Sequence, residues 1–382
     1  MIYFDNSATT KMDPSVLQTY DAVCQNIWGN SSSLHSWGEK AFNLLEQSRK
    51  QIADLMDCYP DEIYFTSGGT ESDNWAIKGT AMEKRPYGKH IITSSVEHAA
   101  VMNSMKHLEK MGFDVTYLPV DDEGRVSPED VRKAIRKDTI LVSIMAINNE
   151  IGTIQPIEEI AEILDDYPKI HFHVDSVQAI GKGVEKLIRN PRVDFLAFSG
   201  HKFHAPRGTG FMYKKRGRMV QPLIDGGGQE KNLRGGTENL PAIAGMAKAL
   251  RLLMEDEDQK VAHQRAIKDR IYQHISQFDK VHIFSKNDET FAPHILCFTI
   301  DGVRGESIVH AFEKYDIYIS TTSACSSKKG DIAGTLAAMK VPEKIATSAV
   351  RVSLDEHNTL EEADEFNRVF DKLYEEFKMI NS

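Results

Sequence analysis

Lys202 and Asp175 are the two residues whose types and positions point most directly to chemistry. Lys202 lies in the turn Ser199-Gly200-His201-Lys202 after an apolar run, and Asp175 ends the run Phe172-His173-Val174. Both should stand at the carboxyl ends of strands, where α/β sheets bind ligands. A neutral lysine can form a Schiff base with an aldehyde, and a carboxylate can keep a pyridine nitrogen protonated. Alone, each has an ordinary interpretation, a loop lysine or a helix N-cap; together they are more informative.

A glycine-rich turn, Thr66 to Ser72, joins another expected strand to a helix. Gly69 lets the backbone come close to a ligand, while the Thr70 hydroxyl and the N–H groups of the helix start can donate to a phosphate. The spacing matches neither a Walker loop nor GxGxxG, which disfavours nucleotide binding. His98 opens the next helix and could stack on a flat cofactor and relay protons. Gln178, three residues after Asp175, could reach a ring oxygen.

Four cysteines, Cys24, Cys58, Cys297 and Cys325, are scattered without CxxC or metal-type spacing. We therefore expect free thiols and no metal site. Cys24 on a helical apolar stripe and Cys297 in an apolar strand are expected in the core, and Cys58 is expected to pack or cap a turn. Cys325 differs because it lies among small polar residues beside two lysines, a setting that exposes a thiol and favours thiolate. Of the four, it is the candidate nucleophile.

Arg351 alternates with Val350 and Val352 in an expected strand. A guanidinium fork captures a carboxylate with two hydrogen bonds, so Arg351 could hold an amino-acid substrate. Without further context, an arginine facing solvent or held in an internal ion pair explains the pattern better.

The elements that must position these residues alternate between short β-rich runs and helical stretches from about 62 to 213, which indicates an α/β domain with a mostly parallel sheet covered on both faces. The expected strands are 63–66, 90–93, 115–118, 140–147, 172–174 and 195–198, and the expected helices are 14–27, 39–56, 71–83, 98–111, 127–136 and 157–166. A long helical stretch over 241–276 should lead out of this domain. The remainder suits a smaller α+β domain, with strands at 295–300, 317–319 and 349–354 and helices at 305–314 and 359–378.

The composition is that of a globular protein, with 382 residues, 41% hydrophobic and 27% charged. The net charge of −10 argues against non-specific binding to nucleic acid or anionic membranes. No apolar run reaches the roughly 18 residues that span a bilayer, and the first residues show no signal peptide. We therefore expect a cytoplasmic protein with no membrane and no direct nucleic-acid partner.

Taken together, these stretches resemble the cysteine desulfurases of the NifS/IscS type, a branch of the class V aminotransferase family within PLP fold type I. The resemblance covers nearly the whole chain, from Tyr3-Phe4-Asp5-Asn6-Ser7-Ala8-Thr9-Thr10 to Arg351-Val352-Ser353-Leu354. Its most specific pieces are Asn148-Asn149-Glu150-Ile151-Gly152, His173 to Gln178, Ser199 to Lys202 and Arg234-Gly235-Gly236-Thr237-Glu238-Asn239. It implies a seven-stranded type of sheet in a large domain at 15–255, and a small domain at 1–14 and 256–382 that carries the cysteine loop.

The resemblance also implies a role for each matching residue. Lys202 is similar to the lysine that binds pyridoxal 5′-phosphate, Asp175 to the pyridinium partner, Gln178 to the residue on the ring oxygen and His98 to the residue stacked on the ring. Gly69, Thr70, Ser199 and His201 match the phosphate cradle, and Thr237 matches a residue that reaches the phosphate from the second subunit of a homodimer. Asn149 and Arg351 match the positions that hold the carboxylate of L-cysteine, and Cys325 the cysteine that becomes a persulfide while alanine leaves.

Two departures from the family pattern stand out. Ala205 replaces a glycine, which should be tolerated, and Ser326-Ser327-Lys328-Lys329-Gly330 follows Cys325 where Thr-Ser-Gly is common. The second departure resembles a bacterial subgroup that serves tRNA thiolation, so a thiouridylase is the expected sulfur acceptor, with an iron–sulfur scaffold as the alternative. A selenocysteine lyase or another class V enzyme, and an adaptor that only relays sulfur, are the competing functions.

Overall fold

The computed structural model describes residues 1–322 and 334–380, which form a seven-stranded, a four-stranded and a two-stranded β-sheet. Within the described residues the larger sheet has seven strands in the order β2 (Ile63–Thr66), β8 (Gly210–Lys214), β7 (Phe195–Ser199), β6 (His171–Asp175), β5 (Thr139–Ser143), β3 (His90–Ser94) and β4 (Asp114–Leu118). The pairings between β7 and β4 are parallel, whereas β8 is antiparallel to both of its neighbours. The predicted α/β class with a mostly parallel sheet is confirmed. The sequence pattern did not reveal β8.

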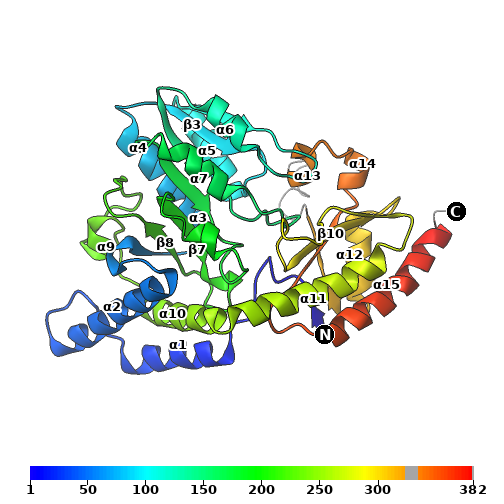
Figure 1. The fold of residues 1–382 in the computed structure, drawn as a ribbon. Helices are drawn as coiled ribbons and strands as arrows, with labels where there is room; N and C mark the ends of the chain where they lie inside the picture. The colour runs from blue at the N-terminus through cyan, green and yellow to red at the C-terminus, as the bar shows by residue number, and fades with distance from the viewer. Residues whose placement is uncertain (323–333, 381–382) are drawn as a thin grey trace.

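Helices lie on both sides of this sheet (Figure 1). They are α1 (Pro14–Asn26), α2 (Ser36–Met56), α3 (Gly69–Asn74), α4 (Thr80–Lys84), α5 (Ala99–Lys110), α6 (Pro128–Ala134), α7 (Ile157–Asp165), α8 (Glu185–Ile188), α9 (Gln229–Asn232) and α10 (Leu240–Met254), with short 3₁₀ turns at Pro60–Glu62 and Gly200–Lys202. The Asp13 carboxylate caps α1 by accepting from the backbone N–H of Ser15 at 2.7 Å and of Val16 at 3.3 Å. As expected for a proline at the first helical position, Pro14 loses no hydrogen bond there.

The predicted helix over 241–276 is wrong as a single element. The chain forms α10 and then α11 (Glu257–Ile275), and the break lies at Asp256, whose φ of 53° is left-handed. Aspartate tolerates this conformation better than most residues, and apolar spacing continues across the break, so periodicity alone could not locate it.

The smaller sheet is antiparallel, in the order β12 (Ser320–Thr321), β13 (Val350–Ser353), β10 (Ile295–Ile300) and β9 (Val281–Ile283). Nearby lie α12 (Gly305–Glu313), α13 (Thr335–Ala338), α14 (Glu343–Ala346), α15 (Leu360–Ile380) and the two-stranded pair β1 (Ile2–Tyr3) and β11 (Ile317–Tyr318). The sheet packs on α11, α12 and α15 through a second hydrophobic core. Phe312 and Phe366 stack in that core with ring centroids 4.7 Å apart, a contact worth about 1 kcal/mol beyond the area it buries.

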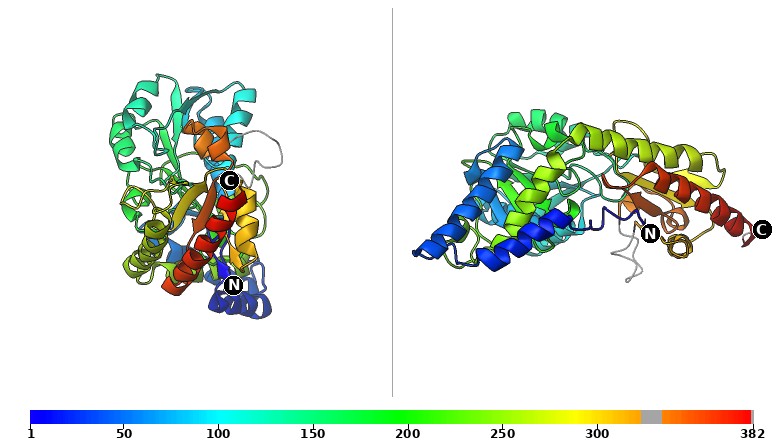
Figure 2. Two further views of the ribbon diagram at one scale, coloured as in Figure 1. Left: turned by 90° about the vertical axis from the view of Figure 1, so that its right-hand side faces the viewer. Right: turned by 90° about the horizontal axis from the view of Figure 1, so that it is seen from below.

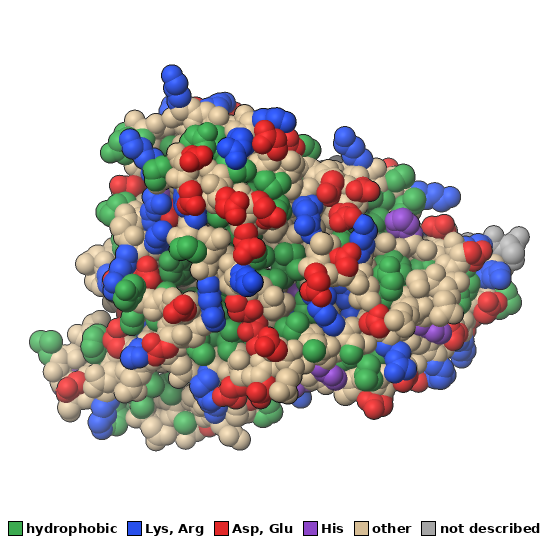
Figure 3. All heavy atoms as spheres, viewed as in Figure 1, with side chains coloured by type: hydrophobic (Ala, Val, Ile, Leu, Met, Phe, Trp, Pro, Cys, Tyr) green, Lys and Arg blue, Asp and Glu red, His purple; other side chains and the backbone are tan. Residues whose placement is uncertain are grey.

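The two sheets occupy opposite ends of the molecule. Figure 2 shows α1 and α2 at one end and α15 at the other. Acidic and basic side chains are interspersed over the face drawn in Figure 3, rather than gathered into a field of one sign. Among the helices that the structure describes, none combines the length and apolar character that a membrane crossing requires.

The N-terminal segment connects the smaller sheet to the turn that carries Lys202. Asp5 bridges to Ser353 at the end of β13, and the Ser7 backbone N–H donates to the Ser353 hydroxyl at 2.9 Å. Five residues after Asp5, the Thr10 N–H donates to the His201 carbonyl at 2.8 Å. These contacts hold residues 5–10 between the two larger sheets, where Ser7 and Ala8 line the cavity described below.

Candidate active site

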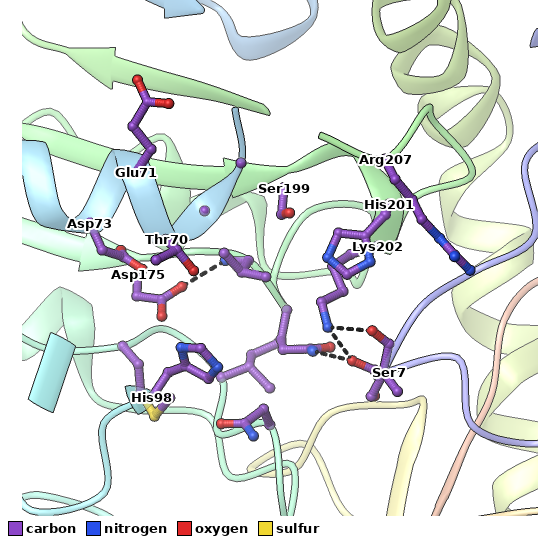
Figure 4. A pocket seen from close by; sticks show the side chains of 18 of the residues that line it. Ser7, Thr70, Glu71, Asp73, His98, Asp175, Ser199, His201, Lys202 and Arg207 are labelled. Carbon is purple, nitrogen blue, oxygen red and sulfur yellow. Dashed lines mark hydrogen bonds between the residues drawn. The ribbon is translucent and has the colours of Figure 1, made fainter. Parts of the chain in front are cut away.

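A cavity of about 560 Å³ lies at the carboxyl ends of β6 and β7. Ten of the sequence-predicted site residues line it, from segments far apart in the chain: Gly69, Thr70, His98, Asn149, Asp175, Gln178, Ser199, His201, Lys202 and Arg351. The larger sheet explains why nine of them meet, since successive parallel strands deliver their following loops to the same edge, whereas Arg351 comes from β13 of the smaller sheet. Figure 4 shows Lys202, Asp175, His98 and Thr70 around the cavity.

The Lys202 amine contacts main-chain carbonyls of the N-terminal segment. Its Nζ donates to the carbonyl of Ser7 at 2.5 Å and of Ala8 at 2.9 Å (Figure 4). Gln178 donates to the same Ser7 carbonyl at 3.1 Å. The sequence assigned no role to these two carbonyls, because a main-chain acceptor leaves no trace in residue type. They hold the lysine at the cavity wall.

Asp175 forms the floor of the cavity at one end. Its carboxylate accepts the backbone N–H of Val177 at 3.0 Å, and no helix begins there, so it is not an N-cap. Burial raises the pKa of Asp175, and the neighbouring His98 and Lys202 act in the opposite direction. A cation at this end of the cavity would restore the charge that burial disfavours.

Two further buried carboxyls, Asp73 and Glu97, lie beside Asp175, and sequence reasoning gave neither a role. Asp73 lines the cavity and is 1% exposed; burial, reinforced by repulsion from Asp175 and Glu97, raises its pKa well above the ordinary value. Burial raises the pKa of Glu97 to about 8, although Ser94 and the Met145 N–H donate to it. The run Gly69-Thr70-Glu71-Ser72-Asp73-Asn74 is polar throughout, so residue type alone did not distinguish Asp73 from its neighbours.

The opposite end of the cavity offers neutral donors. It comprises Ser199 and His201 from the Lys202 turn. Gly69 and Thr70 at the start of α3 also line the cavity, and Figure 4 shows Thr70 next to Asp175. Burial, together with Lys202 and Arg207, lowers the pKa of His201 to about 4, so its ring is neutral near pH 7. A Cβ on Gly69 would lie 2.5 Å from a Val177 methyl group. A side chain there would therefore collide with the floor of the cavity.

Arg351 is buried and faces the cavity from β13. One guanidinium nitrogen donates to the Asn149 carbonyl at 2.7 Å, and another pairs with Asp5 at 3.1 Å. Its Nε has no hydrogen-bond partner among the described residues. The internal ion pair and the cavity position of Arg351 therefore coexist.

His98 caps α5, as its position in the sequence predicted. Its Nδ1 accepts the Ala100 N–H at 3.1 Å, so in the neutral ring the proton is on Nε2. The side chain is exposed toward the cavity, which it lines. It is thus available to contact a ligand there.

Two predicted site residues do not appear in the cavity. Thr237 is exposed and does not line it, and Cys325 lies outside the described residues. Ser320, Thr321 and Thr322, which precede Cys325 by three to five positions, do line it.

The expectation for Cys24 was wrong. It is exposed, because in α1 only Val16 and Val23 are buried and the next position turns about 100° away from Val23. Cys297 is buried as expected, and burial raises its pKa. Burial and nearby carboxylates raise the pKa of Cys58 to about 12. Neither of these two thiols is therefore a ready thiolate.

The chain matches known proteins over its whole length. The family model "Aminotransferase class-V" covers residues 2–366. A "NifS/IcsS protein homolog" from Lactobacillus delbrueckii subsp. bulgaricus is 64% identical, with 100% of this chain and 99% of the relative covered. A "Cysteine desulfurase IscS" from Methanosarcina thermophila is 42% identical, and the match covers 99% of this chain and 93% of the relative.

Solved structures with similar folds have related names. A "NIFS-LIKE PROTEIN" superposes with a TM-score of 0.90 at 38% identity, covering 99% of each chain. A second structure, "SspA in complex with cysteine", has a TM-score of 0.81 at 33% identity and covers 94% of this chain and 100% of that one.

Proposed function

The chain belongs to the class V aminotransferase family and to its cysteine desulfurases, and from this premise we propose how its own residues perform the reaction. Pyridoxal 5′-phosphate is bound through Lys202, L-cysteine is converted to L-alanine, and the sulfur remains on Cys325 as a persulfide. The acceptor is a tRNA thiolation enzyme.

The observation that carries the proposal is the polarity of the cavity. Asp175, a buried carboxyl, lies at one end, and the Ser199 hydroxyl lies on the other side, near His201 (Figure 4). Pyridoxal phosphate has the matching polarity, with a basic ring nitrogen at one end and a phosphate at the other, and Lys202 is placed to meet its aldehyde. The residues present therefore fit the group.

Pyridoxal phosphate, when bound, supplies an electron sink for the Cα of an attached amino acid. Arg351 and Asn149 orient the substrate carboxylate at the other wall of the cavity. Lys202 and His98 are the two groups placed to carry protons, and His98 presents its Nε2 because Nδ1 is engaged by Ala100. The neutral His201 donates to the phosphate without adding charge.

The sulfur step requires a nucleophile that the described residues do not provide. The Cys325 thiolate attacks the substrate sulfur: an S–S bond forms and the Cβ–S bond breaks. The electron pair of the broken bond stays on Cβ, which takes a proton, so that alanine leaves. The position of Ser320 to Thr322 in the cavity wall supports this role, because it brings the chain within a few residues of Cys325 to the substrate.

A homodimer completes the phosphate site in this proposal. Thr237 is exposed, and its loop is tied to α3 by the ion pair of Arg234 with Glu71 at 2.8 Å. Large apolar side chains are exposed on α2 and the segments that flank it, including Trp28 at 70% and Leu34 at 104%, and burial of such groups favours association. A second copy would cover them and present its own Thr237.

The experiment supplies ³⁵S-labelled cysteine to the wild-type protein and to Cys325→Ser. The wild type should form a labelled, reductant-sensitive adduct and alanine, and Cys325→Ser should form neither while it keeps its cofactor absorbance. Cys24→Ser, which changes an exposed thiol elsewhere, is the matched control and should behave as wild type. Undiminished sulfide release by Cys325→Ser would contradict the assignment.

The acceptor is tested by chasing the labelled persulfide into purified candidates. The Ser326-Ser327-Lys328-Lys329-Gly330 segment supports transfer to a thiouridylase. Exclusive labelling of an iron–sulfur scaffold would overturn this part of the proposal and leave the desulfurase chemistry intact.

A further inference from the structure

Three buried carboxyls, those of Asp73, Glu97 and Asp175, lie together beneath one end of the cavity. All three belong to residues less than 10% exposed. Among the described residues, His98, the Val177 N–H and Lys202 act against the effect of burial on the pKa of Asp175. Three carboxylates in so apolar a setting repel one another, and each loses hydration, so they cannot all be ionised.

The three carboxyls differ in how many hydrogen-bond donors surround them. Glu97 accepts from the Ser94 hydroxyl at 2.5 Å and the Met145 N–H at 3.0 Å, and Asp175 accepts the Val177 N–H. One oxygen of Glu97, Oε2, and one of Asp73, Oδ1, have no hydrogen-bond partner in the described part of the chain, but Glu97 keeps two donors on its other oxygen, whereas no donor is found for the Asp73 carboxyl among the described residues. Of the three, it has the least support for a negative charge.

The neighbour of Asp73 cannot supply a counter-charge. His173 Nε2 lies 3.2 Å from Asp73 Oδ1, but the two atoms are out of line for a hydrogen bond. The other ring nitrogen contacts the Ser143 hydroxyl at 2.8 Å. Full burial lowers the pKa of His173 to about 3, so the ring is neutral. An ion pair between Asp73 and an imidazolium is therefore excluded near pH 7.

We propose that Asp73 is a positioning residue for the cofactor: it holds a proton as a neutral acid, donates its O–H to the Asp175 carboxylate, and leaves Asp175 alone to face the ring nitrogen. The proposal rests on the proposed function, since it assigns a role toward bound pyridoxal phosphate. Figure 4 shows the side chains of Asp73 and Asp175 next to each other at this end of the cavity.

The titratable groups near Asp73 come from several elements. Strand β6 contributes His173 and Asp175, and the segment after β3 contributes Glu97 and His98. Lys202 faces Asp175 from its own turn. On α3 itself, Glu71 is engaged by Arg234 and by the Ser67 N–H.

The first test follows the thermal stability of the apoprotein from pH 5 to pH 8. An acid that stays protonated when folded but ionises when unfolded stabilises the fold fully only below its unfolded pKa, and this contribution is lost as pH rises. Asp73→Asn, which cannot ionise, should therefore gain in melting temperature over wild type as pH increases. Asp21→Asn, an exposed change on α1, should show a constant difference. A constant difference for Asp73→Asn would mean that Asp73 is ionised in the fold, and would overturn the proposal.

The second test measures the affinity of each apoprotein for pyridoxal phosphate by titration. Asparagine keeps an N–H donor toward Asp175, so Asp73→Asn should bind within about threefold of wild type. Asp73→Leu has the same bulk but no donor, and should bind about tenfold more weakly. Equal affinities of the two variants for pyridoxal phosphate would contradict the proposed hydrogen bond from Asp73 to Asp175. If Asp73→Leu does not fold, Asp73→Asn decides alone: a loss of tenfold or more overturns the proposal.

The two tests separate this inference from the function on which it rests. The stability test contains no cofactor, so it judges the protonation of Asp73 whatever the enzyme does. Failure of wild type to bind pyridoxal phosphate would overturn both the proposed function and the positioning role.

Discussion

The two ends of the cavity solve opposite electrostatic problems. The acid end, formed by Asp73, Glu97 and Asp175, concentrates carboxyls in a buried setting with little compensation, and burial raises all three pKa values. The donor end, formed by Ser199 and His201, carries no formal charge near pH 7, because burial, Lys202 and Arg207 keep His201 neutral.

The difference teaches which end depends on the ligand. At the acid end, the charged form of Asp175 is stabilised only when a cationic group of the ligand binds beside it. The binding energy at this end therefore comes mainly from one charge pair. At the donor end, the binding energy is divided among several neutral hydrogen bonds, each of which contributes about 1 kcal/mol. One substitution should therefore cost much more at the acid end than at the donor end.

The largest effect is expected for Asp175→Asn. The change is isosteric but removes the charge, and breaking a buried charge pair costs about 2–5 kcal/mol, which corresponds to a cofactor affinity at least about thirtyfold lower. Titration of the apoprotein with pyridoxal phosphate measures it. A cofactor affinity within threefold of wild type would contradict this difference between the two ends, because the charge of Asp175 would then contribute little to binding.

Arg351→Lys tests a wall that belongs to neither end. Lysine keeps the charge but loses the planar fork, so we expect the KM for L-cysteine to rise about tenfold or more while cofactor affinity stays unchanged. Steady-state kinetics and cofactor titration on the same preparation separate the two effects. A parallel loss of cofactor affinity would show that the walls are not independent.

Ser199→Ala tests the donor end. One neutral donor is lost among several, so cofactor affinity should fall only about fivefold, and the shape of the turn should not change. A loss as large as that of Asp175→Asn would mean that the donor end is as concentrated as the acid end, against the comparison.

The smallest effect is expected for His204→Gln, two residues beyond Lys202 and outside both ends. Burial lowers the pKa of His204, but the ion pair with Glu356 at 3.4 Å and the nearby Asp355 outweigh burial and raise it. The stability from this pair is complete below the unfolded histidine pKa and is lost as pH rises through the folded one. The melting temperature of the variant should thus fall below wild type at pH 6 and approach it at pH 9. Cofactor affinity should not change at either pH.

Much of this arrangement was visible in the sequence. The strand-ending positions of Asp175 and Lys202, the glycine-rich turn before α3 and the capping place of His98 are local properties, and each lies where it was predicted. Local pattern also carried the two-domain expectation, which stays a prediction in its boundaries. It failed where tertiary contacts override periodicity, at the break at Asp256, at β8 and at the outward-facing Cys24.

The sequence by itself determined which chemical groups meet, because parallel strands deliver their ends to one edge and residue types at those ends are readable. Only the tertiary structure decided their charges and contacts. Asp73 lines the cavity with Asp175, and Glu97 is buried close to both. Arg351 pairs with Asp5, and the carbonyls of Ser7 and Ala8 accept from Lys202. The protonation of these side chains depends on burial and on charges brought close from distant segments, and local residue spacing predicts neither.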